Sequence, residues 1–393
     1  MGTLIFRWFL SRTVRQAVDM CRQVRKFIRA QCDLLAPEKI QEISKAAREL
    51  KGAITAGENL DDIRARMKHL EKVANDNLLP YPNGSIRENI EVFLVTGALV
   101  LALRTFFFQP MAIPSGSAQP TLWGITSENL RAIPDVEIPR GLERLIQTCW
   151  AGTHYFHKVA ENSGELRIDP PKTIFPLIKR QVLWVGARAY SVWFPPDDLE
   201  NKAGLHDGQL IQKGEEFLKL KVISGDHLFV NRLTYNFRRP RRGEIIVFES
   251  TGIPDIIQNT HYIKRLIALG GEHVRIGNDR HVIINGVRLD ASTPHFENVY
   301  SFNPKEPPRA DHYSGHVNGS VHPGLARLLP DEKTEFVVRP HHYLAFGDNT
   351  MNSNDGRNWG DFPEEKVIGK ASFVFWPIGG RDHAPGRFGW GYR

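Results

Sequence analysis

The sequence predicts a mostly β domain of antiparallel sheets that follows one membrane-spanning helix and a helical N-terminal region. Three features support this: a helical periodicity over residues 12–79, an apolar run over residues 90–108, and short β-prone runs after it. The chain has 393 residues, of which 41% are hydrophobic, and this ordinary composition excludes disorder throughout. Three cysteines exclude a disulfide scaffold, and a mean hydropathy of −0.33 excludes a polytopic membrane protein.

Residues 1–89 are expected to form a basic, helical, cytoplasmic region. Apolar residues recur three and four positions apart in three stretches, which predicts three helices. These stretches are residues 14–28, 40–50 and 60–73. The region of Gly52 and Gly57 is expected to separate the second helix from the third, and Pro80 to Gly84 to end the bundle.

Most of the chain's net charge of +7 lies in this region, since residues 1–90 carry 16 Lys/Arg against 11 Asp/Glu. The apolar run Leu4–Leu10 lies in its most basic part. Apolar and basic residues together are typical of a segment that lies on an anionic membrane surface, and the alternative is a solvated, frayed helix.

The run from Ile90 to Phe108 is expected to be a transmembrane helix. Its uncharged part, Val92–Leu103, has only 12 residues and on length alone fits a buried core helix. Arg104 can reach toward lipid headgroups, however, and Phe106–Phe108 suit a membrane interface. The 19 residues together span roughly 28 Å at about 1.5 Å per residue. The basic residues before the span place the N-terminus in the cytoplasm and residues 109–393 outside.

Residues 109–393 are expected to form an extracytoplasmic, β-rich domain. Short β-prone runs are separated by Gly, Pro, Asn and Asp, and Asn285-Gly286 is a strong hairpin signal. The runs are Leu228–Val230, Glu244–Phe248, Tyr262–Ile267 and His281–Ile284. The stretch at about 123–222 holds no recognisable motif and is interpreted as an insertion.

The first cluster with chemical potential is Ile113–Leu122, directly after the span. Ser115 and Ser117 are two positions apart and so face the same side of an extended segment. One hydroxyl can then attack a carbonyl while the other donates a hydrogen bond to the oxyanion. The alternative is an ordinary Ser-Gly-Ser loop.

The second cluster is Tyr262–Gly271, in which Lys264 has apolar neighbours. Burial disfavours the ammonium form and lowers the pKa of a lysine, which lets the neutral amine act as a base for a serine. The alternative is an edge-strand lysine that discourages aggregation.

The third cluster is Gly347–Gly360, a polar segment rich in Asn and Asp. The spacing of its residues excludes a calcium loop of the EF-hand type. Asp355 and Arg357 can pair and hold the segment rigid, so that Ser353 orients a neutral lysine. The alternative is a polar turn of self-bonding residues.

In this order the clusters resemble the boxes of type I signal peptidases, the membrane-bound Ser–Lys proteases. The resemblance covers residues 90–122 and 224–378, and five boxes carry it. They are Pro114–Leu122 after a span, Gly225–Val230, Arg242–Phe248, the unchanged Tyr-Ile-Lys-Arg box Tyr262–Arg265, and Gly347–Gly360.

The resemblance implies a signal-peptidase/repressor-protease-like fold with Ser117 as nucleophile and Lys264 as general base. It implies no metal and no cofactor. The supporting residues by position are Ser115, with the backbone N–H of Ser117, in the oxyanion hole, Ser353 beside Lys264, and the pair Asp355 and Arg357.

The implied substrates are preproteins with signal peptides, cleaved after small residues in an Ala-x-Ala pattern. The substrate pocket is expected to be lined by Pro114, Ala118, Leu122, Tyr262 and Ile263. Ala118 stands where the family commonly has Met, so the resemblance does not fix the shape of the pocket. Glu244 stands where the family has Asp, which is a mild change.

The resemblance places the protein in the bacterial inner (cytoplasmic) membrane, single-pass, with the catalytic domain on the outer face. Membrane lipid and an export translocase are the further partners it suggests, and no nucleic acid is expected. One alternative is a catalytically inactive relative that binds signal peptides or serves the secretion machinery. Another is a self-cleaving repressor protease, against which the span and the missing helix-turn-helix argue. The pairs His154/His157 and His312/His316 lack an acidic partner at metalloprotease spacing and are interpreted as ordinary histidines.

Overall fold

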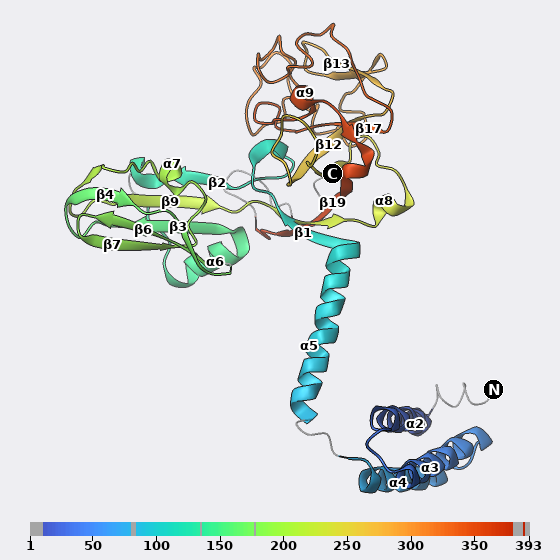
Figure 1. Cartoon of the computed structure of the whole chain (residues 1–393). Helices are drawn as coiled ribbons and strands as arrows, with labels where there is room; N and C mark the ends of the chain where they lie inside the picture. Colours follow the sequence, from blue (N-terminus) through green and yellow to red (C-terminus); the bar gives the residue numbers. More distant parts are fainter. Residues whose placement is uncertain (1–10, 80–83, 134–135, 177, 380–387, 390–393) are drawn as a thin grey trace. The chain divides into compact units, whose positions relative to one another are not determined.

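The computed structural model describes residues 11–79, 84–133, 136–176, 178–379 and 388–389 (Figure 1). The run Leu4–Leu10, expected on a membrane surface, lies outside these residues. The chain divides into one compact unit that ends at Gly97 and a second that begins at Ala98.

The first unit contains three helices that share one core, which confirms the helical N-terminal region. They are α2 (Arg12–Ala30), α3 (Pro37–Ala56) and α4 (Leu60–Asn77). Residues at helical spacing, such as Ile43 and Leu50 of α3 and Ile63 and Leu70 of α4, are fully buried between them. The side chain of Ser11 caps α2 by accepting a hydrogen bond from the backbone N–H of Val14.

The break between α3 and α4 lies at Gly57 and not at Gly52. Gly57 has a left-handed backbone (φ 77°), which a glycine adopts without a steric penalty. Gly52 lies inside α3, because its cost of about 1 kcal/mol relative to alanine is outweighed by the burial of neighbours such as Leu50 and Ile54.

Among the described residues, one helix is long and apolar enough to cross a membrane. It comprises α5 (Gly84–Ala102) and a π-helical turn, η1 (Leu103–Phe107). The stretch Ile86–Phe107 has a mean hydropathy of 1.9 and is not buried by the rest of the chain. Phe108, expected as the last residue of the span, has an extended backbone and begins the first strand.

The main sheet of the second unit brings together strands from both sides of the stretch 123–222. Each pair of neighbouring strands described in it is antiparallel. In order across the sheet they are β1 (Phe108–Ala112), β10 (His227–Asn231), β19 (Val367–Trp376), β11 (Ile245–Glu249), β12 (His261–Leu269), β17 (His342–Phe346) and β18 (Phe362–Pro363). The predicted β runs 228–230, 244–248 and 262–267 correspond to β10, β11 and β12.

A smaller sheet packs its apolar side chains into a core with those of β12 and β17. Its strands in order are β15 (Val287–Arg288), β14 (Val282–Ile284), β13 (His273–Ile276) and β16 (Phe336–Val337). The predicted hairpin is confirmed, since Asn285 and Gly286 join β14 to β15 with φ values of 50° and 83°. Four short helices complete this part: η2 (Gly116–Ala118), α8 (Thr234–Phe237), α9 (Gly356–Trp359) and η4 (Glu364–Lys366).

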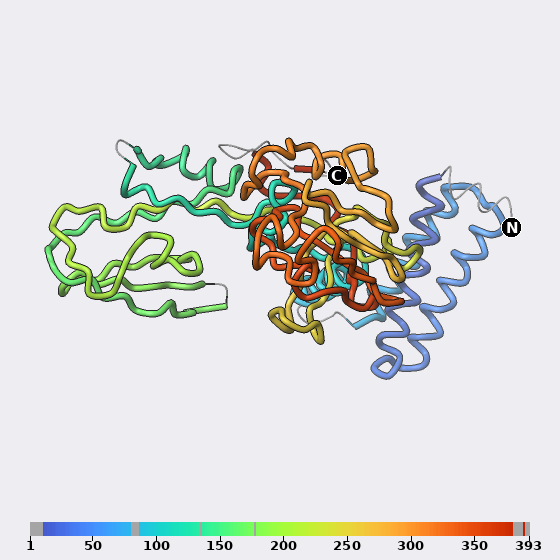
Figure 2. Tube along the Cα trace, turned by 90° about the horizontal axis from the view of Figure 1, so that it is seen from above, coloured from blue at the N-terminus to red at the C-terminus, as the bar shows by residue number. Residues whose placement is uncertain are grey.

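The stretch interpreted as an insertion forms sheets of its own, which lie to one side of the main sheet (Figure 2). One holds β2 (Thr126–Asn129), β9 (Leu218–Ile223) and β3 (Thr153–Lys158). The other holds β5 (Lys172–Phe175), β6 (Ile178–Val185), β4 (Gly164–Ile168), β8 (Leu210–Ile211) and β7 (Arg188–Trp193). The helices are η3 (Leu130–Ala132), α6 (Gly141–Ala151) and α7 (Leu199–Ala203). Buried residues such as Leu183 and Phe217 give these strands a separate core.

The two ends of this stretch lie side by side. The Asp226 N–H donates to the Trp123 carbonyl (2.8 Å), and the Trp123 N–H donates to the Asp226 carboxylate (2.7 Å). Gly225 is pressed against the chain before the serine cluster, since a Cβ there would lie 1.8 Å from the Ile113 carbonyl oxygen. The stretch therefore leaves and rejoins the main sheet at one place.

This close approach makes Gly225 sensitive to the smallest side chain. Gly225→Ala should lower the free energy of unfolding by about 1–3 kcal/mol, because the Ile113 backbone has to move. Thermal unfolding followed by circular dichroism measures the change. Gly52→Ala is the matched control, since nothing lies within 4 Å of a Cβ there, and it should be neutral or stabilising. Equal melting temperatures for wild type and Gly225→Ala would contradict the close packing.

Candidate active site

Ser117 lies in η2, the short helical turn after β1. Its side chain is nearly buried, with the residue 8% exposed, whereas Ser115 is exposed. The Ser115 hydroxyl donates a hydrogen bond to the Ser117 hydroxyl over 3.4 Å. The two hydroxyls therefore face one another, as the spacing of two residues predicts.

The third cluster holds the turn of Ser117 in place through its backbone. The Asn349 N–H donates to the Ser117 carbonyl (3.1 Å), and the Asn349 side-chain amide donates to the Gly116 carbonyl (2.9 Å). A Cβ on Gly347 would lie 2.4 Å from the Ser117 carbonyl oxygen and 2.2 Å from the Ser353 hydroxyl. The absence of a side chain at Gly347 thus lets Ser117 and Ser353 approach each other.

Lys264 lies in β12, against which η2 packs, and is only 3% exposed. Its ammonium nitrogen donates to the Ser353 hydroxyl over 3.1 Å. Burial lowers the pKa of Lys264 to about 8, and the nearby Asp355 carboxylate opposes this shift only in part. An appreciable fraction of the side chain is therefore a neutral amine near neutral pH.

Asp355 and Arg357 form an ion pair in which both side chains are fully buried. The Arg357 guanidinium donates to both carboxylate oxygens (2.8 and 2.9 Å) and to the Thr350 hydroxyl (2.7 Å). Burial opposes ionisation of Asp355, but the charge of Arg357 outweighs burial and holds the pKa of the carboxyl below its usual range. The Gly347 N–H also donates to this carboxylate (2.9 Å), so the pair fixes both ends of the loop that carries Ser353.

A second buried ion pair, Arg265–Asp348, joins all three clusters. Arg265 follows Lys264 in β12 and donates to the Asp348 carboxylate at 2.7 and 2.6 Å. Asp348 also accepts a hydrogen bond from the hydroxyl of Thr121 in the serine cluster. The remaining donors of Arg265 bind the carbonyls of Gly243 and His295 (both 2.7 Å).

A groove of about 280 Å³ runs between the end of β1 and the start of β12. Three of the residues that the sequence assigns to a substrate pocket, Pro114, Tyr262 and Ile263, are among its lining residues. Ala118 and Leu122 are buried instead in the apolar cluster beneath it, which includes Leu228 and Val247 of the groove's lining. The lining residues are Gln109, Met111, Ala112, Ile113, Pro114, Leu228, Val247, Thr260, His261, Tyr262 and Ile263.

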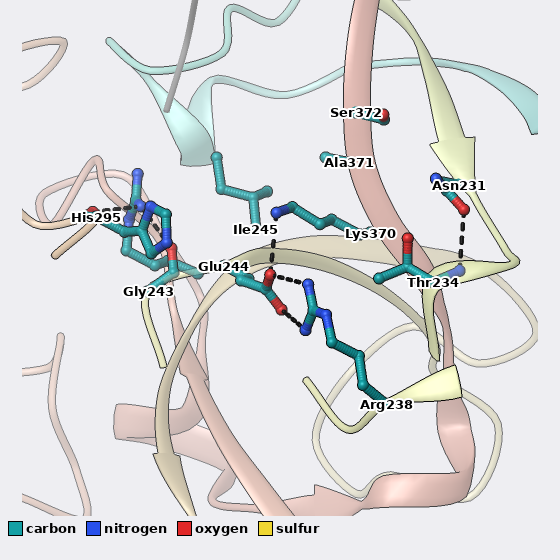
Figure 3. A pocket seen from close by; sticks show the side chains of 11 residues that line it. Asn231, Thr234, Arg238, Gly243, Glu244, Ile245, His295, Lys370, Ala371 and Ser372 are labelled. Carbon is teal, nitrogen blue, oxygen red and sulfur yellow. Dashed lines mark hydrogen bonds and ion pairs between the residues drawn. The ribbon is translucent and has the colours of Figure 1, made fainter. Parts of the chain in front are cut away.

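A separate hollow on the main sheet is lined by Glu244 and by side chains that bind its carboxylate (Figure 3). Its carboxylate accepts hydrogen bonds from Arg238 (3.0 Å) and Lys370 (3.0 Å) and from the backbone N–H of Arg241 (2.9 Å). Burial raises the pKa of Glu244, but these bonds outweigh it and lower the pKa to about 2. The Glu244 carboxylate is thus hydrogen-bonded within the protein and has a structural role.

Of the histidines in the two pairs noted in the sequence, His157 contacts one carboxylate, that of Glu216 (2.7 Å). Within the described ranges, no group of three or more His, Cys, Asp or Glu side chains has a geometry that can hold a metal ion. His316 is fully buried and hydrogen-bonded to the Tyr300 hydroxyl (3.1 Å), and burial lowers its pKa to about 3. It is therefore a neutral core residue.

Comparison with known proteins matches the part of the chain that holds Lys264, Ser353 and the two buried ion pairs. Residues 219–376 match the family model described as signal peptidase, peptidase S26. The chain is 32% identical over 158 residues to signal peptidase I of Leptolyngbya laminosa, which covers 39% of this chain and 61% of that protein. It is 29% identical over 188 residues to signal peptidase I of Pseudomonas fluorescens, with 41% and 63% covered.

The matched part of the chain, residues 219–376, is similar to the peptidase S26 family of signal peptidases. The chain spans less than two thirds of the length of the two curated relatives named above. A solved signal peptidase I from Enterococcus faecalis is 26% identical, covering 34% of this chain and 98% of that one with a TM-score of 0.24.

Several residues that hold this candidate site together were not identified from the sequence. Arg265 and Asp348 lie inside the recognised boxes but received no role, and neither did Thr121 or Asn349. A usable signal existed for Arg265, because an arginine in an apolar strand beside a lysine requires a buried carboxylate partner. The contacts of Thr121 and Asn349 join segments more than 200 residues apart and leave no local pattern.

The buried Arg265–Asp348 ion pair should affect the free energy of unfolding much more than an exposed ion pair does. Asp348→Asn should lower the free energy of unfolding by about 3–5 kcal/mol, because Arg265 is left charged and unpaired. The double variant Arg265→Met/Asp348→Leu should cost less than Arg265→Met and Asp348→Leu together. Urea unfolding of the wild type and of these four variants measures both effects.

The exposed pair Arg327–Asp255 is the matched control, with side chains 63% and 59% exposed. Asp255→Asn should change the free energy of unfolding by about 0–1 kcal/mol. If Asp348→Asn is as mild as Asp255→Asn, the Arg265–Asp348 pair does not hold the site together.

Proposed function

We propose that this chain is a membrane-anchored serine endopeptidase that removes signal peptides from exported preproteins. The observation that carries the proposal is the environment of Lys264. Its amine is buried and bonded to a hydroxyl, Ser353, rather than to a carboxylate, and burial lowers its pKa. The turn of Ser117 packs against the same strand. This is the environment that a lysine needs to act as the base for a serine nucleophile.

The first half of the proposed reaction forms an acyl-enzyme. The Ser117 hydroxyl attacks the scissile carbonyl carbon while its proton passes to the neutral amine of Lys264. The oxyanion accepts hydrogen bonds from the Ser117 N–H and the Ser115 hydroxyl. The tetrahedral intermediate then breaks its C–N bond, and the ammonium of Lys264 gives its proton to the leaving amine.

The second half releases the acyl group by hydrolysis. Lys264 takes a proton from water, whose oxygen attacks the ester carbonyl. The C–O bond to Ser117 breaks, and the proton returns to the serine oxygen. Ser353 acts as a positioning residue for Lys264, and the Asp355–Arg357 pair fixes the loop that carries it.

The groove beside β1 and β12 supports an extended substrate with small side chains. Its lining combines the end of β1 and the start of β12 with apolar residues such as Leu228 and Val247. A volume of about 280 Å³ suits alternate small residues, which agrees with cleavage after an Ala-x-Ala pattern. The buried Ala118 and Leu122 shape the floor beneath this groove.

The proposed setting is the bacterial inner membrane, with residues 1–89 in the cytoplasm, one span, and residues 109–393 on the outer face. The span Ile86–Phe107 and the basic residues before it support this orientation. Residues 123–222 would then be an insertion in the outer domain. Lipid and an export translocase are the surroundings in which such an enzyme meets its preproteins.

Ser117→Ala and Lys264→Ala should each reduce preprotein cleavage by on the order of 10⁴–10⁶ while the folded protein still inserts into membranes. Lys264→Arg should be equally inactive, because a guanidinium stays protonated at any working pH. The measurement is cleavage of a preprotein by each purified variant, with the new N-terminus of the product sequenced.

The matched controls are Ser301→Ala and Lys333→Ala, which change the same residue types at exposed loop positions and should leave activity unchanged. Near-native cleavage by either Ser117→Ala or Lys264→Ala would overturn the mechanism. It would favour an inactive relative that binds signal peptides.

The rate of cleavage should also rise with pH, with a midpoint near pH 8. Only the neutral amine of Lys264 accepts the serine proton, and burial lowers its pKa to about 8. Below this pH the amine is protonated and the rate falls tenfold per unit. A pH profile of kcat/KM measures it, and a midpoint near 6.5 would point to a histidine as the base instead.

A further inference from the structure

Helix α6 in the inserted stretch carries its apolar residues on one face. They recur three and four positions apart, as Leu142, Leu145, Ile146, Cys149 and Trp150. We call these five residues the α6 stripe. Leu142 is 71% exposed and Trp150 is 55% exposed, and no residue of α6 is buried.

The polar face of α6 is the one that packs on the protein, beside β3 (Figure 1). Arg144 donates to the Tyr155 carbonyl, and the Thr148 hydroxyl donates to the Thr153 carbonyl (3.0 Å). The Tyr155 hydroxyl donates to the Gln147 side chain (2.9 Å). A helix on the surface of a soluble domain normally turns its apolar face inward, so this orientation is the reverse of the usual one. The polar contacts fix the stripe facing outward.

The end of α6 is hydrogen-bonded to the end of β19 in the main sheet. The N–H groups of Ile378 and Gly379 both donate to the Trp150 carbonyl (2.9 Å). The indole N–H of Trp376 donates to the Cys149 carbonyl (2.8 Å). The stripe is therefore held at a defined place on the second unit rather than on a separate arm.

That place is one short strand away from the candidate span, because Trp376 pairs with His227 and His227 pairs with Ala112, the last residue of the five-residue strand β1. β19 pairs with β10, and β10 pairs with β1, whose first residue Phe108 directly follows the span. Aromatic rings connect these strands, with Phe108 6.4 Å from Phe229 and Phe229 4.6 Å from Phe375. Tryptophan and phenylalanine at such positions are typical of a membrane interface.

We propose that α6 lies in the interface of the bilayer that α5 spans, with the α6 stripe inserted among the lipid headgroups and upper acyl chains. The occupant is lipid because α6 is tied to the sheet whose first strand, the five-residue β1, begins directly after the span. An amphipathic helix held there is tethered near the bilayer surface, so its effective concentration at that surface is high. The inserted stretch thereby gives the second unit a contact with the membrane besides the span.

The test uses the natural thiol of the stripe in the full-length chain. Cys21→Ala/Cys32→Ser leaves Cys149 as the single cysteine, which takes an environment-sensitive fluorophore. The protein is reconstituted in vesicles of phosphatidylethanolamine and phosphatidylglycerol that contain nitroxide-labelled lipid. The control carries the fluorophore at Leu210→Cys in a chain that also has Cys149→Ser, since Leu210 is a 73% exposed apolar residue of the same stretch.

Nitroxides near the headgroups should quench the label at residue 149 about threefold or more strongly than the label at residue 210. Leu145→Glu/Ile146→Glu should remove most of this difference, and Ile174→Glu, a change at an exposed position away from α6, should not. Tenfold dilution of the protein in lipid should leave the quenching unchanged.

Equal lipid quenching at residues 149 and 210 would overturn the proposal. Loss of quenching on dilution would overturn it in favour of contact with a second copy of the chain. Both readouts are independent of proteolytic activity, so they separate this proposal from the proposed function.

Discussion

Arg265 and Asp348 carry opposite charges at a place that water hardly reaches, since their side chains are 3% and 2% exposed. Neither charge is tolerable there without the other, because an unpaired buried ion costs several kcal/mol. Their attraction therefore holds the loop of Asp348 on the strand of Arg265, and Thr121 joins the serine segment to the same carboxylate. The Arg265–Asp348 ion pair and the Thr121 hydrogen bond can form only where the three sequence clusters meet. These two interactions therefore hold the clusters together.

The protonation state of Lys264 follows from which partners the neighbouring charged groups have. Asp348 is occupied by Arg265, and Asp355 by Arg357, so both carboxylates near the amine already have a cationic partner. The hydrogen bond that Lys264 makes goes to the Ser353 hydroxyl. Burial then outweighs the remaining attraction, and the pKa of Lys264 falls to about 8. The two ion pairs thus leave a buried lysine that can give up its proton.

Local patterns in the sequence predicted most of the elements around this site. The helical spacing over residues 14–73 and the Asn285-Gly286 turn correspond to α2–α4 and the β14–β15 hairpin, because these structures depend on neighbouring residues. Ser117, Lys264 and Ser353 were recognised by their boxes, and the structure brings their segments together. The contacts of Thr121 with Asp348 and of Asn349 with Gly116 were not predicted, since pairs so distant in the sequence leave no periodic signal.

The stretch 123–222 shows a different limit of a sequence pattern. The spacing of Leu142, Leu145 and Ile146 defines an apolar face on α6, but an amphipathic pattern does not specify what covers that face. In α3 and α4 the same spacing places Leu50 and Leu70 in a buried core between the helices. On α6 the polar residues Thr148 and Gln147 bind β3, and the apolar face is left outside. Hydrogen bonds from the Trp376 indole of β19 and from the backbone of Ile378 and Gly379 then tie α6 to the sheet whose first strand, β1, follows the span. The packing of the polar face thus leaves the apolar face available to lipid.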